Sequence, residues 1–130
     1  MALRCLIVDD NADFIEAARD LLERQGIAVV GVASTSAEAL VRARELQPDV
    51  TLLDIDLGEE SGFDVARLLA ATAGLGQVRL VLISTYAEKD FADLIAASPV
   101  AGFVPKATLS ASAIHDVLST SDDGGRAAPT

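Results

Sequence analysis

The chain has 130 residues, of which 51% are hydrophobic and only 4% are aromatic. This length allows about one domain, and the composition indicates an aliphatic core of the kind found in α/β folds. Ten basic residues stand against 20 acidic ones, and the net charge of −10 argues against direct nucleic-acid binding by this polypeptide. One cysteine excludes a disulfide framework, and no apolar run approaches a membrane span, so we expect a cytoplasmic protein without membrane contact.

Short apolar segments alternate along the chain with longer segments of helical spacing. The short segments, rich in Val, Ile and Leu, predict strands buried on both faces at 3–8, 27–33, 50–53, 79–84 and 100–104. The longer segments predict helices at 12–25, 36–47, 62–73, 88–97 and 109–119. Five such alternations predict an α/β fold with a parallel sheet and right-handed βα connections.

The domain is expected to occupy residues 1–120. Residues 121–130 lack periodicity and are poor in apolar side chains, which predicts a disordered C-terminal tail. Within the domain, Gly26 is expected to end the first helix and the pair Gln47-Pro48 the second.

Charged side chains follow three of the predicted strands. Asp9 and Asp10 end the first strand, Asp54 ends the third, and Lys106 follows the fifth. The carboxyl ends of parallel strands form the edge of an open sheet where ligands bind. Carboxylates gathered there repel one another unless a hard cation such as Mg²⁺ lies between them.

Two further residues complete an ordered set with these charged positions. Gly62 lies eight residues after Asp54, and Ser84 follows the fourth strand. Across residues 3–119 the set resembles the receiver domains of bacterial two-component response regulators, which are CheY-like in fold. The resemblance implies a flavodoxin-like, doubly wound fold with five parallel strands in the order 2-1-3-4-5, flanked by five helices. The segment 102–107, Gly-Phe-Val-Pro-Lys-Ala, is similar to receivers attached to LuxR-type output domains.

The resemblance implies that Asp54 is the phosphoacceptor. It would attack the phosphorus of a phosphohistidine on a sensor histidine kinase, or of a small phosphodonor, and form an acyl phosphate. Asp10, Asp54 and the backbone carbonyl of Asp56 would bind Mg²⁺ directly, and Asp9 would act through a bound water. Lys106 would place a fixed positive charge opposite the phosphoryl group.

The resemblance also implies how the signal leaves the site. Ser84 would move toward the phosphoryl oxygen, and Phe103 would be the aromatic side chain whose rotamer follows. The changed surface would be the face of the fourth helix, fifth strand and fifth helix, open to a target protein or to a second copy in a homodimer. The protein would be mainly a signalling switch that catalyses its own phosphorylation and a slow dephosphorylation, which Asp56, Thr85 and Tyr86 would tune.

Several alternatives stay open from the residues themselves. Asp9 and Asp10 could be an N-cap pair, Phe103 could be an ordinary core residue, and Lys106 could be a solvated lysine. Glu59 and Glu60 are expected to lie in a solvated loop.

Alternatives also remain for the function as a whole. Asp54-Ile-Asp56 matches the DxD of haloacid-dehalogenase-like phosphatases, but those place it after the first strand. A pseudo-receiver that binds a partner without phosphorylation is another alternative. The start at Met1 and the tail favour a stand-alone receiver over the receiver segment of a longer LuxR-type DNA-binding regulator.

Overall fold

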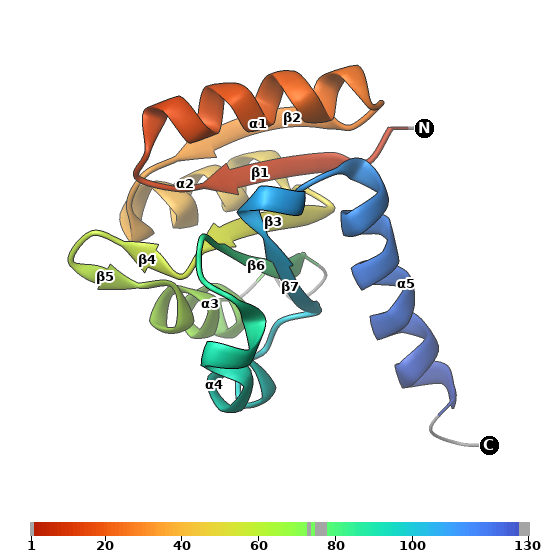
Figure 1. The fold of residues 1–130 in the computed structure, drawn as a ribbon. Coiled ribbons are helices and arrows are strands. Elements are labelled where there is room, and N and C mark those ends of the chain that lie inside the picture. Colours follow the sequence, from red (N-terminus) through yellow and green to blue (C-terminus); the bar gives the residue numbers. More distant parts are fainter. Residues whose placement is uncertain (1, 73, 75–77, 128–130) are drawn as a thin grey trace.

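A five-stranded parallel sheet forms the centre of the molecule in the computed structural model, which describes residues 2–72, 74 and 78–127 (Figure 1). Its strands lie in the order β2-β1-β3-β6-β7, which confirms the predicted order 2-1-3-4-5 because β4 and β5 form a separate hairpin. The bounds of the five strands are β1 Arg4–Val8, β2 Ala28–Ala33, β3 Val50–Asp54, β6 Arg79–Ser84 and β7 Gly102–Pro105.

The described residues form five α-helices, which cover the two faces of this sheet. They are α1 Ala12–Arg24, α2 Ser36–Leu46, α3 Gly62–Ala71, α4 Ala92–Ala96 and α5 Ala111–Ala127. Buried side chains of α1 and α5 pack on one face with Cys5 and Ile7 of β1, whereas those of α2 and α3 pack on the other face with Leu6 and Val8. Successive strand residues therefore serve opposite core layers, as a doubly wound sheet requires.

The helix ends follow local hydrogen-bonding chemistry. Thr35 caps α2 by accepting from the Glu38 amide, and Ser61 caps α3 by accepting from the Phe63 amide. At the other end of α2, Gln47 adopts a left-handed conformation with φ of 46° directly before Pro48. This confirms the predicted end of that helix.

A short antiparallel hairpin of β4 (Asp56–Leu57) and β5 (Glu60–Ser61) follows β3. The sequence predicted a solvated loop here, and that prediction is wrong for Glu60. The Glu60 carboxylate accepts hydrogen bonds from the backbone N–H and the hydroxyl of Ser36, which ties the hairpin to the start of α2. Strands of two residues carry too little periodicity to be recognised in a sequence.

The last two helices differ most from their predicted bounds. The segment predicted as one helix at 88–97 is a 3₁₀ turn, η1 (Glu88–Phe91), followed by the single turn of α4, and neither begins with a side-chain cap. A second 3₁₀ turn, η2 (Lys106–Thr108), precedes α5, which Ser110 caps by accepting from the Ala113 amide.

Helix α5 continues to Ala127, so residues 121–127 of the expected tail are helical. A helix nucleated by packing gains a backbone hydrogen bond for each residue it adds. Residues 128–130 lie outside the described residues. No helix in the described part of the chain is long and apolar enough to cross a membrane.

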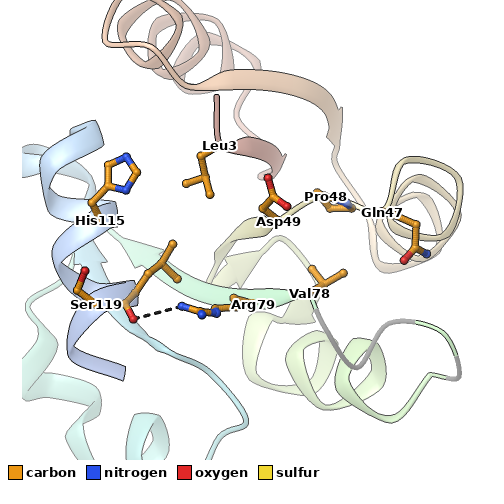
Figure 2. Close-up of a pocket in the computed structure, with 9 residues that line it drawn as sticks. Leu3, Gln47, Pro48, Asp49, Val78, Arg79, His115 and Ser119 are labelled. Atoms are coloured by element: carbon orange, nitrogen blue, oxygen red, sulfur yellow. Dashed lines mark hydrogen bonds between the residues drawn. The ribbon is translucent and has the colours of Figure 1, made fainter. Parts of the chain in front are cut away.

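A cavity of about 590 Å³ opens at the amino ends of the strands (Figure 2). Leu3 and Asp49, which directly precede β1 and β3, line it together with Arg79 of β6 and the exposed His115 of α5. The Arg79 guanidinium donates to the backbone carbonyl of Leu118 at 3.2 Å, which joins β6 to α5. None of the residues predicted for the functional site lines this cavity, because those residues lie at the carboxyl ends of the strands.

Candidate functional site

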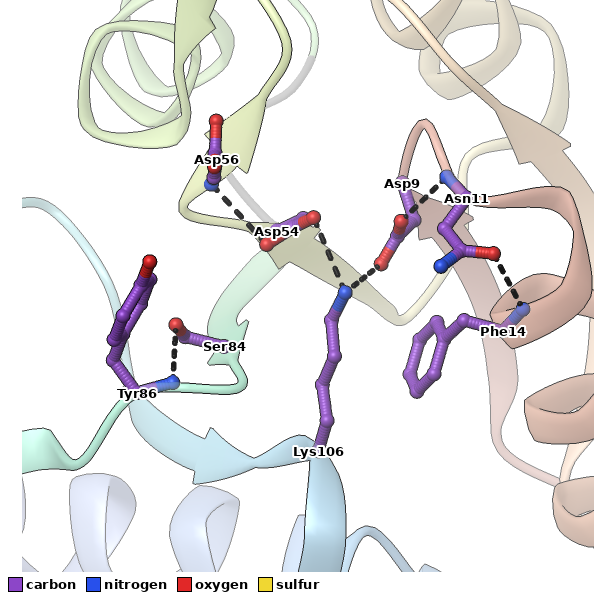
Figure 3. Close-up of polar contacts among 8 residues, drawn as sticks. All are labelled: Asp9, Asn11, Phe14, Asp54, Asp56, Ser84, Tyr86 and Lys106. Carbon is purple, nitrogen blue, oxygen red and sulfur yellow. Dashed lines mark hydrogen bonds and ion pairs between the residues drawn. The ribbon is translucent and has the colours of Figure 1, made fainter.

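The predicted charged residues meet at the carboxyl edge of the sheet (Figure 3). Asp9 follows β1, Asp54 ends β3 and Lys106 follows β7, so the strand order β1-β3-β6-β7 brings them together. The side chains of Asp9 and Asp54 are buried, with 0% and 4% of the residue exposed, whereas Asp10 is exposed. Two carboxylates are therefore held largely out of water at the carboxyl edge of the sheet.

Lys106 connects the two buried carboxylates. Its Nζ lies 2.7 Å from Asp9 Oδ2 and 3.2 Å from Asp54 Oδ2, and only 12% of its side chain is exposed. The same Nζ lies 4.4 Å from the centroid of the Phe14 ring on α1. Lys106 is therefore not a solvated surface lysine.

The second oxygen of Asp9 is held by the chain that leads into α1. The Asn11 backbone N–H donates to Asp9 Oδ1 at 2.8 Å, and the Asn11 side chain caps α1 by accepting from the Phe14 amide. The alternative interpretation of Asp9 and Asp10 as the N-cap pair is thus wrong. Asn11 caps the helix and leaves both aspartate side chains for the site.

Electrostatic repulsion is built into this group of carboxylates. Oxygens of Asp9, Asp10 and Asp54 lie within 4.8 Å of one another, so the group could bind a metal ion. The pKa of Asp54 is raised from its ordinary value of 3.8 to about 6, chiefly by burial and also by the charge of Asp9, against the lowering effects of the Asp56 amide and Lys106. Burial alone would lower the pKa of Lys106, but its pairing with Asp9 and Asp54 raises it.

The backbone around Asp54 is closely packed. The Asp56 amide donates to Asp54 Oδ1 at 3.1 Å, which leaves Oδ2 facing Lys106. Gly62 begins α3 directly against this strand end, and a Cβ there would lie 2.2 Å from the Asp54 carbonyl oxygen. Gly58 adopts a φ of +68° in the turn of the hairpin, a conformation that glycine tolerates.

The predicted switch residues lie on the two strands that follow β3 in the sheet, Ser84 at the end of β6 and Phe103 within β7. The buried Ser84 hydroxyl accepts a hydrogen bond from the Tyr86 amide at 3.0 Å, which stabilises the turn after β6. Tyr86 is 57% exposed, and its ring packs edge-on against Phe91 at 6.0 Å between centroids. Thr85 and Asp56 are exposed, whereas Phe103 is buried in the core layer of α2 and α3.

The family is settled by sequence comparison. Residues 5–119 match the family described as the response regulator receiver domain. The chain belongs to this family. The alternative assignment to haloacid-dehalogenase-like phosphatases is thereby overturned, because the matched family covers most of the chain.

Known proteins similar to this receiver domain include both enzymes and regulators. The protein-glutamate methylesterase/protein-glutamine glutaminase 5 of Myxococcus xanthus is 37% identical over 78% of this chain and 28% of its own length. The response regulator GacA of Pseudomonas viridiflava is 31% identical over 80% of this chain and 48% of its own. The chain thus spans less than half the length of these relatives.

A solved structure supports the same relationship. The crystal structure of a two-component response regulator of the LuxR family from Aurantimonas sp. SI85-9A1 has a TM-score of 0.80 and 28% identity. The match covers 92% of this chain and 87% of that one. This agrees with the LuxR-type resemblance of residues 102–107.

Sequence reasoning missed Asn11 and Phe14, which contact the predicted charged side chains. Asn11 and Phe14 join the site through Asp9 and Lys106, respectively. The only available signal for Asn11 was its favourable residue type for an N-cap. Nothing in the sequence distinguished Phe14 from other apolar residues of α1, because its contact partner lies 92 residues further along the chain.

Proposed function

We propose that this receiver domain, residues 1–120, is a phosphorelay switch in which Asp54 accepts the phosphoryl group. Receiver domains interact with histidine kinases and effector domains, and the donor here would be a sensor histidine kinase or a small phosphodonor. The observation that carries the proposal is the Lys106 ammonium placed between the buried carboxylates of Asp9 and Asp54. Such an arrangement holds a carboxylate nucleophile beside a fixed positive charge at the edge of the sheet.

The transfer step follows from these positions. An Asp54 carboxylate oxygen forms a new bond to phosphorus while the bond from phosphorus to the donor breaks. The electron pair of the broken bond leaves with the donor's imidazole nitrogen or, for acetyl phosphate, with the acetate oxygen. Lys106 offsets negative charge on the phosphoryl oxygens, and the Asp56 amide keeps one Asp54 oxygen in place.

The acidic group fits Mg²⁺, which we propose as the cofactor. Its donor set consists only of carboxylate oxygens, the ligands that this hard cation prefers. Asp9, Asp10, Asp54 and the backbone carbonyl of Asp56 would hold it. When bound, the cation would supply charge compensation for both the carboxylates and the phosphoryl group.

Incubation with acetyl phosphate and Mg²⁺ tests the assignment. Mass spectrometry should find one added phosphoryl group, and peptide mapping should place it on Asp54. Asp54→Asn should abolish the label, whereas Asp116→Asn, which changes an exposed carboxylate on α5, should keep it. An equal label on Asp54→Asn would refute the assignment, and no label on the parent protein would favour a pseudo-receiver.

The output surface is proposed to be the face of α4, β7 and α5. The proposed face carries Ala92, Ala96 and the half-exposed Leu94 from α4, while Ile95 packs inward. Ser84 ends β6 and Phe103 lies in the neighbouring strand β7. A movement of the Ser84 hydroxyl toward Asp54 would therefore change the packing directly beneath this face. We expect the partner to be a target protein or a second copy of the chain.

Binding measurements test this output. Phosphorylation should strengthen binding of a partner, or self-association, by a coupling energy of about 1–3 kcal/mol, which is roughly 5- to 150-fold in affinity. Sedimentation of phosphorylated and unphosphorylated protein would measure the self-association directly. Equal affinities in the two states, for self-association and for every partner, would contradict the proposal.

A receiver carried within a longer DNA-binding regulator is the second candidate. It is supported by the similarity to GacA, of whose length the match covers only 48%, and by the similarity to a crystallised regulator of the LuxR family. We propose a cytoplasmic location whether the receiver stands alone or lies within such a regulator. The reading frame of the encoding gene distinguishes the two, because a helix-turn-helix region encoded downstream would establish the longer regulator.

A further inference from the structure

The ring of Phe14 gives the Lys106 ammonium a third neighbour besides the two carboxylates. Nζ lies 4.4 Å from the ring centroid, within the range at which an ammonium is attracted by an aromatic face. Figure 3 shows the Lys106 side chain extending from just after β7 to a place between Asp54 and Asp9, with the Phe14 ring on the side of α1. The ammonium is therefore bounded by Asp54, Asp9 and an aromatic ring.

The Phe14 ring is held from α1 and is partly buried. Phe14 lies in the first turn of α1, its amide donates to the capping Asn11 side chain, and its side chain packs against the core layer of α1 and α5. Asn11 in turn donates to Asp9, and Asp9 pairs with Lys106. The contacts thus form a closed circuit from Asp9 through Asn11, Phe14 and Lys106 back to Asp9.

We propose that Phe14 is a positioning residue for Lys106. This inference rests on the proposed phosphorylation of Asp54. A lysine side chain has four rotatable carbon bonds, and an ammonium restrained only by carboxylates can follow whichever oxygen moves. Its contact with Asp9 is already shorter than that with Asp54, at 2.7 Å against 3.2 Å. The rigid ring blocks movement of the ammonium toward α1 and so keeps it within reach of the Asp54 oxygen that accepts the phosphoryl group.

The first test measures the order of the lysine side chain without any phosphoryl transfer. The chain has two lysines, so the exposed Lys89 on η1 provides an internal reference in the same spectrum. Carbon relaxation of the ε-methylene groups should show Lys106 ordered in the parent and in Phe14→Tyr, and shifted measurably toward the mobility of Lys89 in Phe14→Leu. Equal order of Lys106 in the parent and in Phe14→Leu would overturn the proposal.

The second test measures the initial rate of labelling by acetyl phosphate. Phe14→Leu should slow it roughly threefold to tenfold, as expected for loss of a partly buried cation–π contact, and Phe14→Tyr should restore it. Ile15→Val changes packing against the same core layer and should leave the rate unchanged.

A Lys106→Met background separates positioning from packing. There, Phe14→Leu should have no further effect on the rate, whereas an equal slowing would show that the ring acts through packing and would overturn the proposal. If the parent takes no label at all, the proposed function fails, and the order of the Lys106 ε-methylene alone decides the role of Phe14.

Discussion

The buried carboxylate of Asp54 should destabilise the folded protein at neutral pH when no cation is bound. Only 4% of the residue is exposed, and burial raises its pKa from 3.8 to about 6. A carboxyl group with a raised pKa in the folded state binds a proton more tightly there than in the unfolded chain. Above pH 6 the folded state therefore carries a charge that the unfolded state accommodates more easily.

Replacing Asp54 with asparagine removes this charge while preserving the shape of the side chain. At about 1.4 kcal/mol per pKa unit, the penalty removed at pH 8 is at most about 3 kcal/mol. This penalty should shrink as the pH falls through 6, because the folded parent then takes up a proton at Asp54. It should vanish near pH 4. The stability advantage of Asp54→Asn should follow this pH dependence.

Urea unfolding in the absence of divalent cations, repeated between pH 8 and pH 4, measures this difference. Asp116→Asn, a change of an exposed carboxylate on α5, should give a difference that varies little over the same range. Adding Mg²⁺ at pH 8 should stabilise the parent more than Asp54→Asn. An advantage of Asp54→Asn that is equal at pH 8 and pH 4 would refute the reasoning, as would a loss of stability at pH 8.

Three further predictions concern packing and lifetime. Gly62→Ala should lower the free energy of unfolding by more than about 2 kcal/mol, measured in urea, because the added Cβ would collide with the Asp54 carbonyl oxygen. Thr51→Val should raise the free energy of unfolding by about 1 kcal/mol, since the buried Thr51 hydroxyl has no hydrogen-bond partner among the described residues. The matched change Thr35→Val should lower it, because it removes the cap of α2. Thr85→Ala should speed phosphoryl loss, followed by mass spectrometry, because a smaller side chain opens the path of water; decay no faster than the parent would exclude such steric gating.

The fold could be predicted from the sequence because its signals are local and repeated. Apolar runs such as 50–53 and 79–84 mark strands whatever their neighbours are, and the parallel order follows from the alternation with helices. The carboxylates and Lys106 could be placed at one edge for the same reason, since each follows a strand. Their pairing required only that the strands lie in the predicted order.

The features that could not be predicted from the sequence mostly depend on contacts between residues far apart in the chain. The hairpin of β4 and β5 is held by Glu60 and Ser36, which lie 24 residues apart, and Phe14 meets Lys106 only because α1 and β7 converge at one edge. The shortness of α4 has a local basis in the absence of a side-chain cap, but a helical spacing of apolar residues conceals it. Tertiary contacts of this kind leave no periodic trace in a sequence.

The two loops that flank Asp54 are anchored very differently, which has a consequence for hydrogen exchange. On one side, the hairpin is fastened to α2 through Glu60. On the other side, η1 and α4 begin without a side-chain cap and contribute only the partly buried Phe91 and Ile95 to the core. Amides of 88–97 should therefore exchange through local opening, while those of β3 exchange only when the whole domain unfolds. A change at Asp54, the proposed phosphoacceptor, would therefore displace the segment of η1 and α4 more easily than the hairpin that is tied to α2.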